Sequence, residues 1–454
     1  MNNWVEKETA GSQINDLRLK KRLKTLVNRF TNEPMESIPS ASEGWSETLA
    51  AYRFLDNEKV DFGSIISGHR EATIERIKNQ SVVLALQDTT FLNFEKQEDC
   101  QFGTLKRTQS NHYLLHPTVA FTPDRVNLGV LGAKFWQRPE MPVAHERSRK
   151  PIEEKESYRW LESYALACEV QKRCPETTVI SVADREGDIG EWFMDAENRP
   201  AEEKAEFIVR AKCNRRTEKN AGEHSYLWDE LSECRALGSI IFTTPRNKNN
   251  KPREVELELK SKELTFVGKQ GTKGKSVTVY AVYGKERKPV EKEKPIEWML
   301  LTSLPVDDLS GAQTIMGWYR SRWEIEIYFK VLKGGCTIED LRLETDRRLL
   351  NCIAIYLIVS WRIHTITMAS RSYPNESCEK IFVEKEWRTI YVMHKKIKPP
   401  NKAPSLREIT RMMAQLGGFL ARKGDGEPGV KNTWRGFRRL MEYMSAMALA
   451  HNLS

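Results

Sequence analysis

The spacing of hydrophobic and polar positions divides the chain into segments of different character. Residues 14–80 carry hydrophobic positions at helical spacing and predict a small helical module. Its helices are expected at the basic segment around 17–30, at 46–54 and around 65–77. From Ser81 the pattern changes to the apolar runs SVVLALQDTT, LLHPTVAF and VNLGVLGAKFW, which predict three strands of a meander.

The pattern then alternates between helix and strand. Residues 154–173 predict a helix, and TVISVADREGD predicts another strand that ends in acidic residues. From Phe207 to about Pro305 the chain is rich in predicted strands and carries two basic loops, RNKNNKPRE and GKQGTKGK. We interpret this stretch, which ends in the strand WMLLTSLPV, as a β insertion into an α/β unit. From Ala312 onward helices predominate, with breaks at 397–405 and 424–429.

Composition fits an intracellular globular protein. With 454 residues, 39% hydrophobic and 30% charged, the chain is long enough for two or three folded domains, and global disorder is excluded. The eight cysteines form no CxxC pair and have no nearby histidine at zinc spacing, so we expect neither a zinc site nor disulfides. We find no signal peptide and no run that approaches the ~18–20 apolar residues of a membrane span.

The net positive charge of the chain favours a polyanionic partner. The 72 Lys and Arg exceed the 63 Asp and Glu, which gives a formal net charge of +9. Cations are concentrated near the N-terminus, where hydrophobic residues run between them, as expected for a basic helix with one buried side. These cations are Arg18, Lys20, Lys21, Arg22, Lys24 and Arg29.

Carboxylates follow two of the predicted strands. Asp88 comes after VVLALQ, and Asp184 comes after VISVA. Strand ends in α/β sheets hold functional side chains at a crevice. Either acid considered alone is more typical of a turn or a helix cap than of an active site.

The segment GWYRSRWEIEIYFKVLKGG carries a more specific pattern. On one continuous helix, four polar residues fall within an arc of about 60°, whereas Glu324 points away from them. The four are Tyr319, Arg322, Glu326 and Lys333. An ordinary ion pair between Arg322 and Glu326 is the simpler alternative. The surrounding apolar residues argue against it, because clustered charges on a mostly buried helix need metal ions or phosphates to compensate them.

Two strand-end acids and one helical acid suit a metal-dependent reaction on DNA. Asp88, Asp184 and Glu326 can hold two Mg²⁺ ions about 4 Å apart, and Mn²⁺ suits the same oxygen ligands. Tyr319, Arg322 and Lys333 are then expected along the phosphate backbone beside the cut.

These motifs resemble the acidic-triad (DDE) transposases of the IS-four or Tn-five kind, which have a ribonuclease-H-like core. The resemblance runs from about Leu17 to the C-terminus, and its most specific mark is the signature Tyr-(2)-Arg-(3)-Glu-(6)-Lys at 319–333, beside the strand motifs QDTT at 87–90 and DREGD at 184–188. It implies that Asp88, Asp184 and Glu326 are the catalytic metal ligands. Asp184 is preferred to Asp188 because it opens the DRE motif.

The resemblance also implies roles in DNA binding. Trp298 matches a tryptophan on which the family stacks a flipped base, and a core aromatic residue is the alternative. Within the β insertion, cations after Phe207 either reach DNA or are solvated surface charges: Arg210, Lys212, Arg215 and Arg216. At the N-terminus, recognition of the transposon end competes with a simple exposed helix face for Arg18, Lys20, Lys21 and Arg22.

We therefore expect an α/β protein with a ribonuclease-H-like mixed sheet. Its parts are a helical domain that binds DNA ends at 1–70, a catalytic core at 71–372 with the β insertion at about 205–305, and a helical dimerisation domain at 373–454. The expected protein is a cytoplasmic, nucleoid-associated bacterial transposase that acts as a homodimer in a synaptic complex. It binds inverted repeats, cuts by two-metal-ion hydrolysis, excises through a hairpin and inserts into target DNA by transesterification.

Two alternatives stay open. A stand-alone metal-dependent endonuclease fits the acids but not the basic N-terminal helix or the long C-terminal helical region. A non-catalytic, transposase-derived DNA-binding inhibitor fits the charge but has no need of three acids. The sequence does not determine the terminal repeat, the target preference, regulation, the physiological metal or whether the free protein is a dimer.

Overall fold

A computed structural model describes residues 3–94, 112–137, 150–220, 223–244, 252–267, 276–290 and 293–451. The predicted loop GKQGTKGK, most of RNKNNKPRE and Cys100 lie outside these ranges. The chain divides into two compact units. Unit 1 comprises Met1–Asn79, Thr89–Met141 and Glu324–Ser454, and unit 2 comprises Gln80–Asp88 and Pro142–Trp323.

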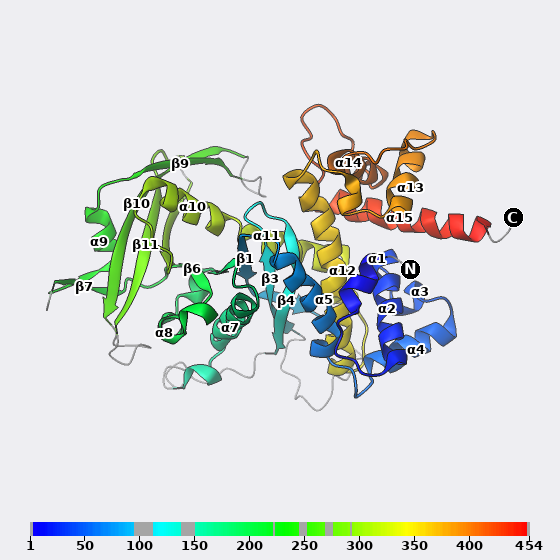
Figure 1. The fold of residues 1–454 in the computed structure, drawn as a ribbon, viewed down its shortest axis with the longest axis horizontal. Coiled ribbons are helices and arrows are strands. Elements are labelled where there is room, and N and C mark those ends of the chain that lie inside the picture. Colours follow the sequence, from blue (N-terminus) through cyan, green and yellow to red (C-terminus); the bar gives the residue numbers. More distant parts are fainter. Residues whose placement is uncertain are drawn as a thin grey trace. The chain divides into compact units, whose positions relative to one another are not determined.

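Unit 1 begins with the predicted helical module (Figure 1). Its helices are α1 (Asn3–Thr9), α2 (Leu17–Asn32), α3 (Ile38–Ala41), α4 (Trp45–Leu55) and α5 (Phe62–Ile77). The Asp16 side chain caps α2 by accepting a hydrogen bond from the backbone N–H of Arg18. The apolar face of α2 is buried at Leu23, Val27 and Phe30, so the basic helix has the one buried side that its pattern predicts.

Three antiparallel strands of unit 1 follow in the chain: β2 (Thr90–Asn93), β3 (His112–Phe121) and β4 (Asn127–Trp136). β3 and β4 match predicted strands, whereas the short β2 was not predicted. Gly129 of β4 has a φ of 144°, and a Cβ there would lie 1.9 Å from the Thr73 Oγ1 of α5. Only glycine therefore lets β4 pack this closely on α5.

The long helix α12 (Asp346–Ser372) forms the core of unit 1. It contacts α2, α4, α5, α14, α15 and β4, and nearly all of its residues are buried. It is long and apolar enough to cross a membrane, but 94% of its most hydrophobic window is buried within the fold. No unbroken apolar run of that length is present in this helix, because polar residues such as Arg362 and His364 interrupt it, although its mean hydropathy is that of a span. A helix buried on all sides is typical of a large core.

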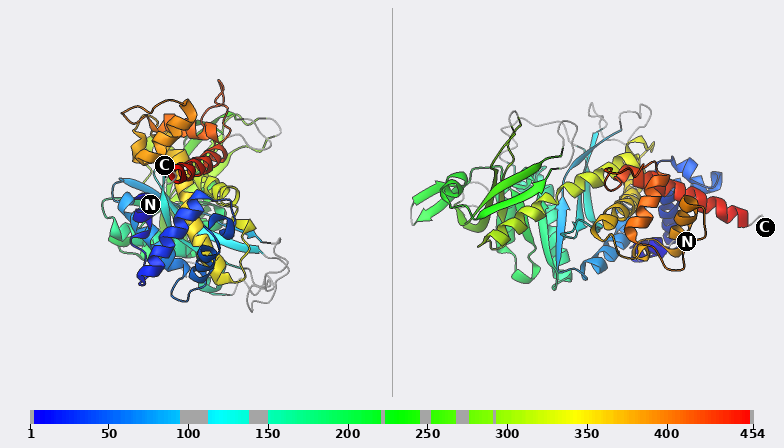
Figure 2. Two further views of the ribbon diagram at one scale, coloured as in Figure 1. Left: turned by 90° about the vertical axis from the view of Figure 1, so that its right-hand side faces the viewer. Right: turned by 90° about the horizontal axis from the view of Figure 1, so that it is seen from above.

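The C-terminal part of unit 1 is a helical group of α13 (Glu384–Lys395), α14 (Leu406–Leu416) and α15 (Val430–His451). Figures 1 and 2 show these helices together, and they share a core that includes Trp387, Met413 and Phe437. The backbones of α14 and α15 come very close: a Cβ on Gly436 would lie 1.9 Å from the carbonyl oxygen of Met413.

Unit 2 is built on a mixed sheet with strand order β1-β5-β6-β12-β11-β10-β7-β8, and β9 pairs with β10. The bounds are β1 Val82–Gln87, β5 Thr178–Ala183, β6 Glu206–Arg210, β7 Arg216–Asn220, β8 Glu223–Tyr226, β9 Gly238–Thr243, β10 Glu254–Val267, β11 Ser276–Glu286 and β12 Glu297–Thr302. β1, β5 and β6 are parallel, and β12 joins β6 in the antiparallel sense. The β insertion therefore extends the sheet that carries the two predicted aspartates.

Helices complete unit 2. α7 (Tyr158–Arg173) packs against β1 and β5, α8 (Gly190–Asn198) follows β5, and α9 (Leu227–Glu233) packs on β10. Tyr164 of α7 is fully buried and donates a hydrogen bond to the carbonyl oxygen of Ala205 at 2.7 Å. α10 (Leu309–Arg320) lies against β9, β10 and β11. The α/β fold class with a mixed sheet is confirmed.

Candidate active site

The two predicted aspartates occupy equivalent positions at the ends of neighbouring parallel strands. Leu86 of β1 is paired with Val182 of β5, and Asp88 and Asp184 each follow two residues later. Adjacent strands lie about 4.8 Å apart, and alternate residues face the same side of a sheet. This register brings Asp88 and Asp184 to adjacent positions at the carboxyl ends of β1 and β5, where α/β sheets hold their ligands.

Each carboxylate has a defined partner within unit 2. Asp88 accepts a hydrogen bond from Nη1 of Arg322 at 2.7 Å, and both side chains are mostly buried. Asp184 accepts one from the backbone N–H of Glu186 at 2.8 Å and so caps the 3₁₀ turn Arg185–Gly187. Paired carboxylates are the hard oxygen donors that Mg²⁺ and Mn²⁺ prefer, so this pair fits a divalent cation.

Asp188, the other aspartate of the DREGD motif, has a structural role. Its buried carboxylate accepts hydrogen bonds from the backbone N–H groups of Lys212 and Cys213 at 2.7 and 2.8 Å. It also pairs with Arg215, whose Nε lies 2.9 Å away. These contacts fix the chain that leaves β6, which supports the choice of Asp184 as the metal ligand. They also hold Arg215 inside the fold, while the Lys212 side chain is exposed.

The sequence pattern places the four signature residues on one continuous helix. The structure divides this helix into separate elements. α10 ends at Arg320, α11 runs over Trp323–Lys330, and a π-helical turn follows at Val331–Gly335. Between α10 and α11 the backbone N–H groups of Ser321 and Arg322 bond three residues back, which tightens the chain into a turn.

This break changes which signature residues share a surface. Tyr319 lies on α10, Arg322 in the break, Glu326 on α11 and Lys333 in the π-helical turn. The boundary between the two units passes between Trp323 and Glu324. Tyr319 and Arg322 therefore belong to unit 2 with Asp88 and Asp184, whereas Glu326 and Lys333 belong to unit 1.

Three arginines of unit 2, Arg185, Arg210 and Arg322, lie near one another, and Arg322 contacts Asp88. Arg210 of β6 donates from Nη2 to the carbonyl oxygen of Glu297 at 3.0 Å. Burial lowers the pKa of Arg210, and the nearby positive charges of Arg185 and Arg322 lower it further. The Tyr319 phenol is buried beside Arg210 and Arg322, and burial raises its pKa, so it stays neutral and can donate a hydrogen bond. Closely spaced guanidinium groups of this kind suit the binding of phosphates.

Trp298 belongs to a column of aromatic rings at the surface of unit 2. It lies parallel to Phe242 with ring centroids 6.0 Å apart, and it contacts the ring of Tyr319 edge-on at 5.6 Å. The guanidinium carbon of Arg320 lies 3.9 Å from the centre of the Phe242 ring. Trp298 and Phe242 are both half-buried. Sequence reasoning missed Phe242, because only the fold brings β9 to β12.

In unit 1, Glu324 and Glu326 of α11 lie in different surroundings. Glu324 is 3% exposed, with Arg125 Nη1 at 3.7 Å and His364 Nε2 at 3.9 Å, and burial raises its pKa to about 7. Glu326 is half-buried. Lys333 donates a hydrogen bond to the carbonyl oxygen of Phe91 and lies 3.6 Å from Glu339.

Within the described parts of the chain, no group of three or more His, Cys, Asp or Glu side chains is arranged to hold a metal ion. In unit 2, Arg322 engages Asp88, and Asp184 caps a turn. A cation that binds the Asp88 oxygen held by Arg322 must therefore displace the guanidinium group.

The N-terminal cations fall into two groups. Lys24 pairs with Glu6 at 2.5 Å and Arg29 with Glu47 at 3.3 Å, so these two hold the helical module together. Arg18 pairs with the capping Asp16 and is otherwise exposed. In the described part of the chain, ion pairs are absent for the three remaining predicted residues, Lys20, Lys21 and Arg22.

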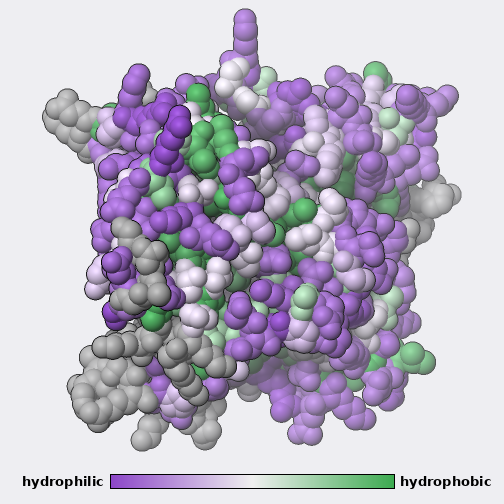
Figure 3. All heavy atoms as spheres, turned by 60° about the vertical axis from the view of Figure 1, so that its left-hand side comes forward, coloured by the Kyte–Doolittle hydropathy of each residue, from purple (hydrophilic) through white to green (hydrophobic). Residues whose placement is uncertain are grey.

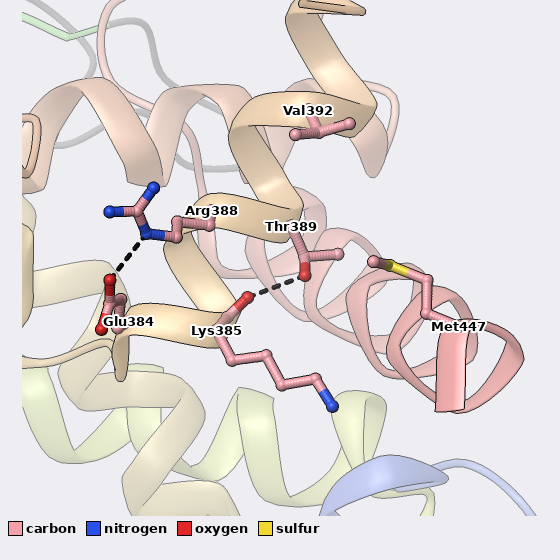
Figure 4. A pocket seen from close by; sticks show the side chains of 6 residues that line it. All are labelled: Glu384, Lys385, Arg388, Thr389, Val392 and Met447. Carbon is pink, nitrogen blue, oxygen red and sulfur yellow. Dashed lines mark hydrogen bonds and ion pairs between the residues drawn. The ribbon is translucent and has the colours of Figure 1, made fainter. Parts of the chain in front are cut away.

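The face shown in Figure 3 is mostly hydrophilic, with hydrophobic residues in small scattered groups. A cavity of about 350 Å³ lies between α13 and α15 in the C-terminal helical group. Figure 4 shows its wall, where Glu384 pairs with Arg388, while Val392 and Met447 provide apolar surface. This cavity is lined by residues of the helical group alone.

Models of three protein families match consecutive parts of the chain. Residues 1–60 match "Transposase DNA-binding", residues 197–361 match "Transposase DDE domain", and residues 358–454 match "Transposase Tn5 dimerisation domain". Together they leave only residues 61–196 unmatched. The DDE match includes Glu326 and begins after Asp88 and Asp184.

A cryo-EM structure of the piggyBac transposase synaptic complex with hairpin DNA is also similar to this chain. The two chains share 10% identity with a TM-score of 0.32, and the match covers 97% of this chain and 81% of the other. This likeness is weak, and the family assignment does not depend on it. The three consecutive family matches show that the chain belongs to the DDE transposases of the Tn5/IS4-like type and is a DNA transposase with a DNA-binding and a dimerisation domain.

Proposed function

We propose that this transposase cuts DNA at a divalent-metal site formed by Asp88, Asp184 and Glu326. The observation that carries the proposal is the register of β1 and β5, which sets Asp88 and Asp184 side by side. Glu326 follows Arg322 by four residues along the chain, and Arg322 contacts Asp88. Bound Mg²⁺, for which Mn²⁺ can substitute, supplies an activated water and stabilises the leaving oxygen.

The cations of the site hold the DNA backbone in this proposal. The planar guanidinium group of Arg322 releases Asp88 and binds a phosphate instead. Arg210 lies nearby as a second phosphate ligand. Tyr319 stays neutral and donates a hydrogen bond to a phosphate oxygen. The Lys333 side chain releases the carbonyl oxygen of Phe91 and binds the DNA backbone near the cut.

The DNA substrate is the pair of transposon ends. Lys20, Lys21 and Arg22 of α2, with Arg18 at its start, recognise the inverted repeat. Two protomers join through the C-terminal helices to form a synaptic complex. Excision passes through a hairpin while a flipped base stacks on Trp298, and insertion into target DNA is a transesterification. These steps follow the family resemblance, as do the domain bounds 1–70, 71–372 and 373–454 and a nucleoid-associated, cytoplasmic location in bacteria.

The test uses the full-length protein and a labelled duplex that carries the element's own end. Wild type is compared with Asp184→Asn and Glu326→Gln in Mg²⁺ or Mn²⁺. The matched control is Glu186→Gln, which removes an exposed acid from the same DREGD motif. We expect all variants to bind the end, and only wild type and the control to nick it.

Equal cleavage by wild type, Asp184→Asn and Glu326→Gln would contradict the metal-site proposal. Binding without cleavage by every protein, wild type included, would support the non-catalytic DNA-binding alternative. Cleavage of unrelated duplexes as efficiently as the element's end would support a stand-alone endonuclease.

A further inference from the structure

The aromatic column of unit 2 has features of a nucleotide-binding surface. We define it as Phe242 of β9, Trp298 of β12 and Tyr319 of α10, with Arg320 over the Phe242 ring. Phe242 and Trp298 are nearly parallel, with an angle of 10° between their planes. Parallel rings with a guanidinium group over one of them are the elements that proteins use to stack unpaired bases.

The fold brings Phe242 to Trp298 from a distant part of the sheet. β9 and β12 are not neighbours, because β10 and β11 lie between them. Phe242 is paired with Val255 of β10, and β9 has no other strand partner among the described strands. An edge strand held on one side only can shift by a small amount more easily than a central strand.

Ordinary core packing does not account for the pair. Apolar side chains in the core of unit 2, such as Val255 and Leu257, are almost fully buried, whereas Phe242 and Trp298 are half-buried. Tyr319 is buried and contacts Trp298 edge-on, so it closes one side of the column. The rings of Phe242 and Trp298 therefore remain partly open to solvent.

Cations lie next to the column. Tyr319 is close to both Arg210 and Arg322, and Arg185 and Arg322 act electrostatically on Arg210. An unpaired nucleotide supplies both groups that such a surface binds: a base for the rings and a phosphate for the guanidinium groups. A fully paired duplex offers only the phosphate here, because its bases are already stacked.

We propose that Phe242 is the second wall of a site for one unpaired nucleobase of the DNA end, which inserts between Phe242 and Trp298. This inference deepens the proposed function, since it rests on Trp298 as a base-stacking residue. A base between two rings needs a separation of roughly 7 Å, twice the spacing of about 3.4 Å between stacked bases. The ring centroids of Phe242 and Trp298 are 6.0 Å apart, so the pair must open for a base to enter, and β9, which is paired with β10 alone among the described strands, is the strand that moves. Arg320 of α10 stabilises the position of the Phe242 ring through a cation–π contact.

The test measures binding of the full-length protein to two end duplexes. One duplex is fully paired, and the other carries one unpaired 2-aminopurine near the end, whose fluorescence reports stacking. Phe242→Ala is expected to weaken binding of the unpaired duplex about tenfold or more, the effect of losing one base–aromatic stack, and to leave binding of the paired duplex nearly unchanged. Phe242→Tyr is expected to restore binding and the fluorescence signal.

Two controls separate the outcomes. Ile241→Ala removes the neighbouring side chain of β9, which is 59% exposed, and should behave as wild type in both measurements. If Trp298→Ala loses the preference for the unpaired duplex but Phe242→Ala does not, Phe242 only supports Trp298 and this inference is wrong. If wild type shows no preference for the unpaired duplex, base stacking at Trp298 in the proposed function fails as well.

Discussion

In the proposed function, the ion pair between Arg322 and Asp88 links metal binding to DNA binding. The guanidinium group holds an Asp88 oxygen at 2.7 Å, and the two side chains are 11% and 19% exposed. A charge-assisted hydrogen bond in such a mostly buried place contributes about 1.5–3 kcal/mol. A cation that binds this Asp88 oxygen in the DNA-free protein must first break the bond to Arg322. We therefore expect Arg322→Gln to bind Mn²⁺ about 10- to 100-fold more tightly than wild type when DNA is absent.

The assay is a calorimetric titration of Mn²⁺ into the DNA-free, full-length protein. Arg320→Gln is the control, because it removes the same charge two residues earlier in a side chain that covers Phe242. Asp88→Asn in the Arg322→Gln background should abolish the gain, since it removes the carboxylate. The reasoning is refuted if Arg322→Gln binds Mn²⁺ no more tightly than Arg320→Gln. The same Arg322→Gln variant should bind the end duplex more weakly than wild type, because it loses a phosphate ligand.

Three further predictions follow from local contacts. Glu324→Gln should remove a pH dependence of the free energy of unfolding. The pKa of Glu324 is about 7 in the folded protein and 4.5 ordinarily, so wild type loses roughly 3 kcal/mol of stability as pH rises between these values. Urea unfolding at pH 5 and pH 8 measures this loss. Gly436→Ala should destabilise the C-terminal helical group by about 1–3 kcal/mol, because the added methyl group clashes with the Met413 carbonyl oxygen. Gly429→Ala is the control and should not destabilise it, because no atom lies within 4 Å of the added methyl group. Limited proteolysis distinguishes the two variants. Replacing Lys20, Lys21 and Arg22 together by alanine should reduce the salt dependence of end binding by up to about 0.9 in slope per lost phosphate contact; an unchanged slope would place these residues away from DNA.

Much of the candidate site could be predicted from local sequence. A strand is recognised from its own apolar run, so the ends of β1 and β5, and with them Asp88 and Asp184, could be located before any fold was known. The Tyr-Arg-Glu-Lys spacing likewise identifies the family without coordinates. The preference for Glu326 over Glu324 also followed from helical periodicity, because both residues lie within one regular helix, α11.

The chain between Trp318 and Gly335 shows the limit of that reasoning. A period of 3.6 residues assumes an unbroken α-helix, but the chain turns at Ser321 and Arg322 and widens to a π-helical turn after Lys330. No glycine or proline lies at the first break. The sequence therefore carries no strong local signal for it, and tertiary contacts such as that of Arg322 with Asp88 accompany the turn.

By itself, the sequence determined the type and order of the main strands and helices, the acids at the strand ends and the transposase family, because these depend on neighbours along the chain. Tertiary structure decided which strands pair and in what register, and hence that Asp88 and Asp184 lie side by side. It also decided that α12 is buried within the fold, that Asp188 is structural, and that Phe242 stacks on Trp298. Each of these depends on contacts between residues far apart in sequence, whose free energy no local pattern encodes.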